Sequence, residues 1–252
     1  MVLSLGLVNI FLFFFAAFLL YCYSNIFRYY FRIHYLNGWM LLWSIVLVPV
    51  MVLRGRNVAN MRLLRLVMLP LKYILGIKLN VRGATNLNLK GPYVMVANHQ
   101  SNVDFLGMFQ ILPDRCTLIV KKEILYYFTI GMVTWLSGFI FIDRKNRDPT
   151  IKIMSEAADT MVRDNVPIIP VVMSCYLPFF NTKLNKFTTG EVTIQILPPI
   201  KTEGLSPSDV PELTDRVRET MISTFHELSG SPSKQSSSPE EDAHQATSSQ
   251  ES

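Results

Sequence analysis

Residues 93–104 read Tyr93-Val94-Met95-Val96-Ala97-Asn98-His99-Gln100-Ser101-Asn102-Val103-Asp104, an apolar run followed at once by polar side chains. The apolar run predicts a buried strand, and His99 then emerges at its carboxyl end, where α/β folds place their chemistry. An imidazole with a carboxylate five residues further on can act as a base with an orienting partner. A continuous helix would rotate His99 and Asp104 about 140° apart, so the pairing requires a turn between them.

The same residues also fit a purely structural role. Ser101-Asn102-Val103-Asp104 matches the capping-box pattern at the start of a helix predicted over 105–112. On spacing alone, catalysis and helix capping explain the segment about equally well, and both hypotheses stand at this point.

Further along the chain, β-rich apolar runs alternate with helical ones. Strands are predicted over 77–81, 93–97, 116–120, 139–142, 166–173 and 192–197. The clearest helices are predicted over 149–163 and 209–228, where apolar residues recur every three to four positions. The alternation predicts an α/β sandwich with a largely parallel or mixed sheet. The uncharged stretch 124–142 predicts a helix followed by a strand rather than a membrane span, because Gly138 interrupts it.

The start of the chain carries two uncharged apolar runs. Residues 5–23 have the length that spans a bilayer, and no positive segment precedes them, so we predict a retained membrane helix rather than a signal peptide. Residues 38–53 contain Pro49 and are short for a full span, which favours a re-entrant or tilted segment. We therefore expect a membrane anchor over 1–53, a catalytic domain over 54–228 and a disordered Ser/Glu-rich tail over 229–252.

The net charge of +5 is the sum of −3 in the tail over 229–252 and +8 in the rest of the chain. The cations that follow the second apolar run alternate with aliphatic residues, and they are Arg54, Arg56, Arg62, Arg65 and Lys72. This pattern is typical of an amphipathic helix at an anionic membrane surface, on the cytosolic face. The alternative is an ordinary core helix with solvated charges.

Other titratable residues are less informative about a cofactor. The three cysteines Cys22, Cys116 and Cys175 lie in apolar contexts, which predicts buried, inert thiols and no disulfide framework. The four histidines lack metal-ligand spacing, so we expect neither a metal nor another cofactor.

Two later segments carry charge or proline at strand ends. Lys121 follows a predicted strand and is able to meet an anion, and Asp143-Arg144 ends another, where the Arg144 fork suits phosphate oxygens and Asp143 can hold it. Solvated surface charges are the alternative in both cases. Pro167 and Pro170 each remove a ladder donor from the strand at 166–173, which predicts an edge strand or a shaped wall beside a site.

Together these residues resemble the glycerolipid acyltransferase family, and specifically the 1-acylglycerol-3-phosphate (lysophosphatidic acid) acyltransferases. Three blocks occur in that family's order: Asn-His-x(4)-Asp at 98–104, Gly-x-x-Phe-Ile-Asp-Arg at 138–144 and Val-Pro-Ile-Ile-Pro-Val at 166–171. The resemblance covers roughly 55–228. It implies a glycerolipid-acyltransferase-like sandwich of a mixed sheet and helices, preceded by N-terminal membrane helices.

The resemblance implies acyl transfer from acyl-CoA to the sn-2 hydroxyl of lysophosphatidic acid, giving phosphatidic acid in phospholipid biosynthesis. His99 would be the general base and Asp104 its orienting partner, with no covalent intermediate and no cofactor. The implied partners are the two substrates and the lipid bilayer, not nucleic acid, and the implied location is the endoplasmic reticulum membrane with the catalytic domain in the cytosol. The implied substrate-binding residues are Asn98, Ser101, Lys121, Gly138, Asp143, Arg144, Pro167 and Pro170.

One family block has no counterpart. The family carries Glu-Gly-Thr-Arg between its second and last motifs, but only 21 residues, 145–165, separate Arg144 from Val166 here. The predicted helix over 149–163 fills most of them, so a strand and its Glu-Gly-Thr-Arg loop are missing, as in an in-frame deletion. Two hypotheses follow: an active membrane-bound acyltransferase, or a catalytically impaired variant that acts as a membrane-bound binding or regulatory partner.

Overall fold

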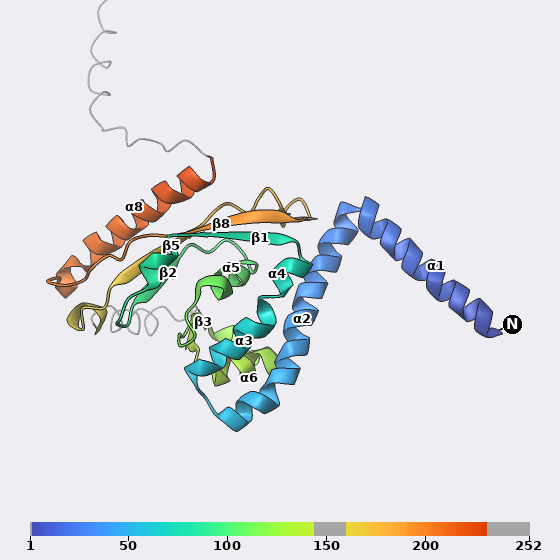
Figure 1. Cartoon of the computed structure of the whole chain (residues 1–252), viewed down its shortest axis with the longest axis horizontal. Helices are drawn as coiled ribbons and strands as arrows, with labels where there is room; N and C mark the ends of the chain where they lie inside the picture. The colour runs from blue at the N-terminus through green and yellow to red at the C-terminus, as the bar shows by residue number, and fades with distance from the viewer. Residues whose placement is uncertain (1, 144–159, 231–252) are drawn as a thin grey trace, which may run out of the picture.

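The computed structural model describes residues 2–143 and 160–230. Two long helices come first, α1 over Val2–Tyr23 and α2 over Asn25–Arg54. Figure 1 shows α1 projecting away from the rest of the molecule, while α2 lies along it. Both helices are long and apolar enough to cross a membrane, by length and composition. The predicted helix at the first apolar run is therefore confirmed.

The second apolar run, residues 38–53, does not form a short segment of its own. It is the second half of a 30-residue helix that continues through the proline. Two arginines in the first half use main-chain carbonyls as partners: Arg28 donates to Tyr21 at 2.9 Å, and Arg32 donates to Leu75 at 2.9 Å. Because these carbonyls compensate the charges, the helix begins well before the apolar run.

The catalytic part of the chain is built on a four-stranded mixed sheet with the order β1-β8-β5-β2. The strands are β1 Ile77–Arg82, β8 Gly190–Ile196, β5 Ile168–Met173 and β2 Val94–Ala97. The pairs β1–β8 and β2–β5 are parallel, and β5–β8 is antiparallel. The predicted α/β fold with a mixed sheet is confirmed.

Two predicted strands do not join this sheet. β3 (Ile119–Lys121) and β4 (Ile140–Ile142) pair in parallel with each other, and β6 (Phe180–Asn181) and β7 (Lys186–Phe187) form a short hairpin. Within the part of the chain that is described, β2 is thus an edge strand. The apolar runs could not show this division, because long-range contacts decide which strands pair.

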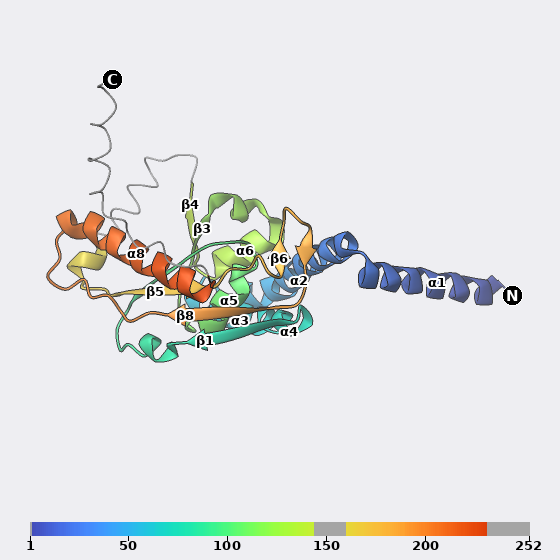
Figure 2. The same cartoon turned by 90° about the horizontal axis from the view of Figure 1, so that it is seen from above.

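Helices cover both faces of the sheet (Figures 1 and 2). α8 lies on one face, and α5 lies on the other with α3 and α4. Their bounds are α3 Met61–Met68, α4 Leu71–Ile74, α5 Asp104–Ile111 and α8 Val210–Leu228. The short 3-10 turns are η1 Val58–Asn60, η2 Ala84–Leu87, η3 Lys122–Tyr126 and η4 Pro207–Asp209. α6 (Phe128–Leu136) precedes β4, as the stretch at 124–142 predicts.

Helix α2 is part of the domain's packing. Leu36 joins the buried cluster beneath the sheet, and Leu47 and Met51 join a second cluster with α3 and α6. The Ser44 and Thr129 hydroxyls, 2.6 Å apart and buried, link α2 to α6. The catalytic domain therefore rests on α2 along most of that helix.

The prediction of an edge strand at 166–173 is wrong, since β5 lies between β8 and β2. Pro170 lies opposite Leu197, one pair beyond Val171–Ile196. Its carbonyl accepts a hydrogen bond from the Leu197 amide at 2.9 Å, so the pairing continues at this residue and only the donor of Pro170 is missing.

The basic segment after α2 contains α3, which packs as a core helix, the alternative that the sequence left open. Its apolar side lies against protein and is not free to contact a membrane surface. Met61, Leu64 and Val67 of α3 are buried in the second cluster. Arg62 is exposed and pairs with Asp114 at 2.6 Å, whereas Arg65 is half-buried and donates to the Leu112 and Gln110 carbonyls. The apolar face of α3 is thus already covered by protein.

Other predictions have mixed outcomes. Cys22 is exposed, so the expectation of a buried thiol is wrong there, because α1 has no protein neighbours over most of its length; Cys116 and Cys175 are half-buried. Residues 160–163 are helical, whereas the rest of the predicted helix at 149–163 and the tail beyond residue 230 lie outside the described residues.

Candidate active site

A histidine and an aspartate meet at the carboxyl end of β2. His99 Nδ1 lies 2.6 Å from Asp104 Oδ2, and the Asp104 side chain is 7% exposed whereas that of His99 is 72% exposed. The turn that the spacing requires is present, since α5 begins only at Asp104. One imidazole nitrogen is therefore held by a buried carboxylate while the ring stays open to a substrate.

Helix capping and the dyad use the same carboxylate. Asp104 Oδ2 also accepts hydrogen bonds from the main-chain amides of Gln100 at 2.7 Å and Ser101 at 3.1 Å. Ser101 Oγ accepts from the Val103 amide at 3.1 Å, so only the Asp104 half of the capping box forms as expected. The capping hypothesis is confirmed in its Asp104 half. The same contacts fix the carboxylate that lies against His99, so capping does not exclude the catalytic hypothesis, which stays a prediction.

Asn98 and Gln100 tie the end of β2 to the end of β5. The Asn98 amide donates to the Met173 carbonyl at 2.9 Å and accepts from the Met173 amide at 2.8 Å. Gln100 Nε2 donates to the Met173 and Ser174 carbonyls, at 3.1 and 3.0 Å. These bonds replace the strand ladder where it ends, and they hold the residues on both sides of His99.

Tyr176 lies on the other side of Asp104. Its main-chain amide donates to Gln100 Oε1 at 3.3 Å, and its hydroxyl donates to Met173 Sδ at 3.2 Å. Burial, and next the negative charge of Asp104, raise the pKa of the Tyr176 hydroxyl far above its ordinary value. Tyr176 is therefore a neutral wall of the site at any physiological pH.

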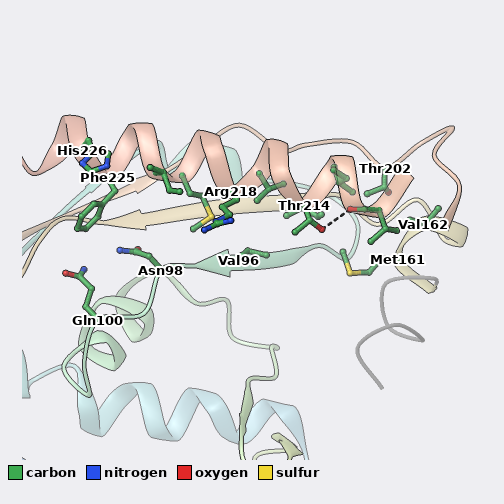
Figure 3. A pocket seen from close by; sticks show the side chains of 16 residues that line it. Val96, Asn98, Gln100, Met161, Val162, Thr202, Thr214, Arg218, Phe225 and His226 are labelled. Carbon is green, nitrogen blue, oxygen red and sulfur yellow. Dashed lines mark hydrogen bonds between the residues drawn. The ribbon is translucent and has the colours of Figure 1, made fainter. Parts of the chain in front are cut away.

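An apolar groove of about 750 Å³ starts beside the dyad and runs between α8 and the sheet (Figure 3). Asn98 and Gln100 line one end, and Thr202 and Met161 line the other. The α8 side consists of Val210, Leu213, Val217, Met221, Ile222 and Phe225, with Arg218 and His226 as its charged or titratable members. The apolar face predicted for the last helix thus lines a groove as well as the core.

A second, more polar cavity of about 320 Å³ lies next to the first. Gln100 borders both cavities, and Ser101, Tyr176, Asn181 and Lys183 line the second. The loop that carries His99 therefore separates an apolar groove from a polar cavity with one lysine. Within the described residues, no group of three or more His, Cys, Asp or Glu is arranged to hold a metal ion.

The other predicted site residues lie in the small β3–β4 sheet. Lys121 ends β3 beside Ile142 of β4, and Lys122, not Lys121, pairs with Asp143 at 3.8 Å. Gly138 lies at the opposite end of β4, with φ +78°, where a Cβ would come 3.1 Å from Val58. Arg144 lies outside the described residues. Lys121 and Asp143 thus share a strand end, whereas Gly138 serves a turn and a close packing contact.

The two prolines of the last motif are not both near the dyad. Pro167 precedes β5, and its carbonyl accepts from the Val94 amide at the amino end of β2, the far end from His99. Pro170 is buried within the sheet beside Val96. Gln100 and Tyr176, which do adjoin the dyad, were missed by sequence reasoning, since a glutamine and a tyrosine carry no distinctive spacing signal.

Comparison with known proteins defines the class. A family model described as "Acyltransferase" matches residues 78–172. This range contains His99 and Asp104, the strands β2, β3 and β4, and most of β5. The crystal structure of the 1-acyl-sn-glycerophosphate acyltransferase PlsC from Thermotoga maritima superposes with a TM-score of 0.57 at 19% identity, covering 81% of this chain and 94% of that one. The fold and the matched residues are those of an acyltransferase.

The particular family follows from sequence similarity. The chain is 42% identical over 234 residues to human 1-acyl-sn-glycerol-3-phosphate acyltransferase alpha, covering 80% of this chain and 83% of that protein. It is 34% identical over 210 residues to the human beta enzyme, covering 71% and 76%. The chain therefore belongs to the 1-acyl-sn-glycerol-3-phosphate acyltransferase family.

The same match bears on the missing block. The alignment is 234 positions long, but it covers only 80% of the 252 residues of this chain, which is about 202 residues. It therefore includes positions of the human enzyme that have no counterpart in this chain. This agrees with a deletion relative to the family.

Proposed function

We propose that this chain transfers an acyl group from acyl-CoA to the sn-2 hydroxyl of lysophosphatidic acid and so forms phosphatidic acid for phospholipid synthesis. The observation that carries the proposal is the 2.6 Å contact between the exposed His99 ring and the buried Asp104 carboxylate, in a chain of this family. Acyl-CoA is a co-substrate, and the reaction requires no cofactor.

In the proposed step, His99 Nε2 takes the proton of the sn-2 hydroxyl as its oxygen attacks the thioester carbonyl carbon. The tetrahedral intermediate then expels the CoA thiolate with cleavage of the C–S bond, and the imidazolium returns the proton to that sulfur. Asp104 holds the Nδ1–H and stabilises the transient positive charge of the ring. Lys121, at the exposed end of β3, and Arg144 are the cations we assign to the acceptor's phosphate.

The test is formation of phosphatidic acid by the purified chain in lipid nanodiscs, with lysophosphatidic acid and acyl-CoA as substrates. We expect His99→Ala to abolish product formation. His34→Ala is the matched control, because His34 lies exposed on α2 and away from the dyad. Equal turnover by wild type and His99→Ala would remove His99 from its role.

The groove between α8 and the sheet is the site that we propose for one acyl chain. Its walls are mostly apolar, Asn98 and Gln100 on either side of His99 line one end of it, and an acyl chain makes no demand for hydrogen bonds. Met221→Trp should fill part of the groove and lower kcat/KM for long acyl chains more than for short ones. Glu219→Trp, on the exposed side of α8, is the control. An unchanged chain-length profile in Met221→Trp would place the chain elsewhere.

We place the enzyme in the endoplasmic reticulum membrane with its catalytic domain in the cytosol. Two apolar N-terminal helices support membrane association, and Arg54 at the end of α2 and Arg56 shortly after it favour the cytosolic side. Protease protection in sealed microsomes tests the orientation. We expect the domain to be digested without detergent, and full protection would reverse the assignment.

The missing Glu-Gly-Thr-Arg block supports a second candidate function. Losing two charged contacts to the phosphate at about 1.5–3 kcal/mol each would weaken acceptor binding a hundredfold or more. The chain would then be a membrane-bound binding or regulatory partner with little turnover. Insertion of a family-typical segment between Asn165 and Val166 should raise turnover strongly in that case. If the chain already turns over as fast as the extended version, the second candidate fails.

A further inference from the structure

Helix α6 and the turn before it present large apolar side chains to the outside. Tyr126, Tyr127 and Phe128 are 73%, 53% and 77% exposed, and Met132 and Trp135 are 47% and 45% exposed. We call these five residues the α6 aromatic patch. No charged residue occurs between Ile124 and Ile142, so the patch has no ionic group of its own. Single exposed apolar residues are ordinary, but a contiguous group of this size marks a contact surface.

The patch belongs to an ordered part of the domain. The opposite side of α6 is buried, with Val133 and Leu136 packed in the cluster that also holds Met51 of α2. Gly131 lies so close to the Leu125 carbonyl that a Cβ there would collide with it, which fixes the turn from η3 into α6. Phe128 adopts a left-handed φ of +45° that a non-glycine residue rarely adopts, so the surrounding fold determines its outward position.

The patch continues the apolar surface of α2. The two helices pack side by side through the Ser44–Thr129 hydrogen bond. Beyond that contact, α2 exposes further aliphatic side chains, and they are Leu41, Leu42, Ile45, Val46, Val52 and Leu53. α2 is also one of two helices apolar enough to lie in a membrane. A bilayer that surrounds α2 would therefore contact α6 as well.

The chemistry at the edge of the patch suits the lipid headgroup region. The Arg56 guanidinium lies 5.4 Å from the centre of the Trp135 ring, and Arg56 Nε donates to the Trp135 carbonyl at 3.2 Å. Tryptophan and tyrosine collect at the boundary between headgroups and acyl chains, and nearby arginines attract anionic lipids. A partner protein would explain the apolar area but not the continuity with a candidate membrane helix.

We propose that the α6 aromatic patch is a second membrane contact, separate from α1, which seats the catalytic domain in the headgroup–acyl boundary of the bilayer. The inference does not depend on the proposed reaction, since it concerns only where the domain lies. It makes α2 and α6 together the underside of the domain.

The experiment uses the full chain with its three cysteines replaced, carrying one new cysteine labelled with an environment-sensitive fluorophore. Phe128→Cys and Tyr126→Cys report on the patch, and both positions are exposed, so neither change opens the core. Glu219→Cys on the exposed side of α8 and Lys183→Cys on the β6–β7 hairpin are matched exposed controls. Each protein is reconstituted into phosphatidylcholine–phosphatidylserine vesicles with or without lipids spin-labelled near the glycerol.

We expect the spin label to quench emission at positions 126 and 128 by about half or more, and emission at 219 and 183 hardly at all. Equal quenching at patch and control positions would overturn the proposal. So would a blue-shifted, unquenched signal at 126 and 128 that depends on the protein-to-lipid ratio, because a second copy of the chain would then cover the patch. Circular dichroism on each variant confirms that the fold is retained.

Discussion

Replacing Asp104 with asparagine tests the dyad most directly. The substitution keeps the shape of the side chain but removes its charge. Three N–H groups converge on Oδ2, from the His99 ring and from the Gln100 and Ser101 amides. These donors should hold the new amide oxygen in the same position, so the His99 ring keeps its orientation and loses mainly its charged partner.

The size of the effect follows from the geometry. Two unit charges about 4 Å apart interact by about 1 kcal/mol in water and about 4 kcal/mol at an effective dielectric constant of 20. His99 is largely exposed and Asp104 is buried, so the imidazolium formed during reaction should lose about 2–3 kcal/mol of stabilisation. That corresponds to a roughly 30- to 150-fold fall in kcat. Weaker bonds to two main-chain amides should also cost about 2 kcal/mol of folding stability.

The assay measures reaction rates with radiolabelled acyl-CoA. It is carried out on the chain as it stands and on the version with the restored segment, and each rate is corrected for the folded fraction of the protein. Asp114→Asn, in the exposed pair with Arg62, is the matched control and should change neither activity nor stability by more than about 1 kcal/mol. His99→Ala and the double variant should be equally inactive, because the two residues act as a unit. A loss of less than about threefold in Asp104→Asn would refute the reasoning.

Three further outcomes concern stability and reactivity. Gly107→Val should destabilise the fold by about 1–3 kcal/mol in thermal unfolding, because a Cβ at this position of α5 would lie 2.9 Å from Met173 Sδ; an unchanged midpoint would mean that α5 can move away from the sheet. Arg32→Met should cost about 1–3 kcal/mol, since it leaves the Leu75 carbonyl without its donor; the control Arg28→Met should cost less, because Arg28 is only half-buried and bonds to the nearby Tyr21 and Cys22 carbonyls. Burial raises the pKa of the Cys116 thiol to about 11, so below that pH the thiol stays protonated. Its alkylation by iodoacetamide at pH 8 should be about a hundredfold slower than that of a thiol with the ordinary pKa, and faster labelling, read by peptide mass spectrometry, would contradict its burial.

Much of the local structure was predictable from the residues. Val94–Ala97 is an uninterrupted apolar run, and the periodicity of α8 is visible in its aliphatic positions, so both elements were found. The second membrane-proximal helix was underestimated because Arg28 reads as a break in the apolar run. Its charge is compensated by a carbonyl that only the folded chain brings near.

The candidate site divides in the same way. Spacing brought out His99 and Asp104 but left catalysis and capping as alternatives, because both demand the same residue types near a helix start. Three N–H groups meet one carboxylate oxygen in the folded chain, so one Asp104 side chain can make both the capping contacts and the contact to His99. The Gln100 side chain bonds to the Met173 carbonyl and to the Tyr176 amide, more than 70 residues away in sequence, and these contacts bring Tyr176 to the dyad.

Residue type and short spacing were enough to predict β2, α8, the His99–Asp104 pair and the family, but not the β6–β7 hairpin or the full length of α2. Tertiary structure alone decided that β5 is central despite Pro170, that β3 and β4 form a separate sheet, and that α2 supports the catalytic domain. Those choices depend on which surfaces exclude water together, and that is a property of pairs of segments distant along the chain.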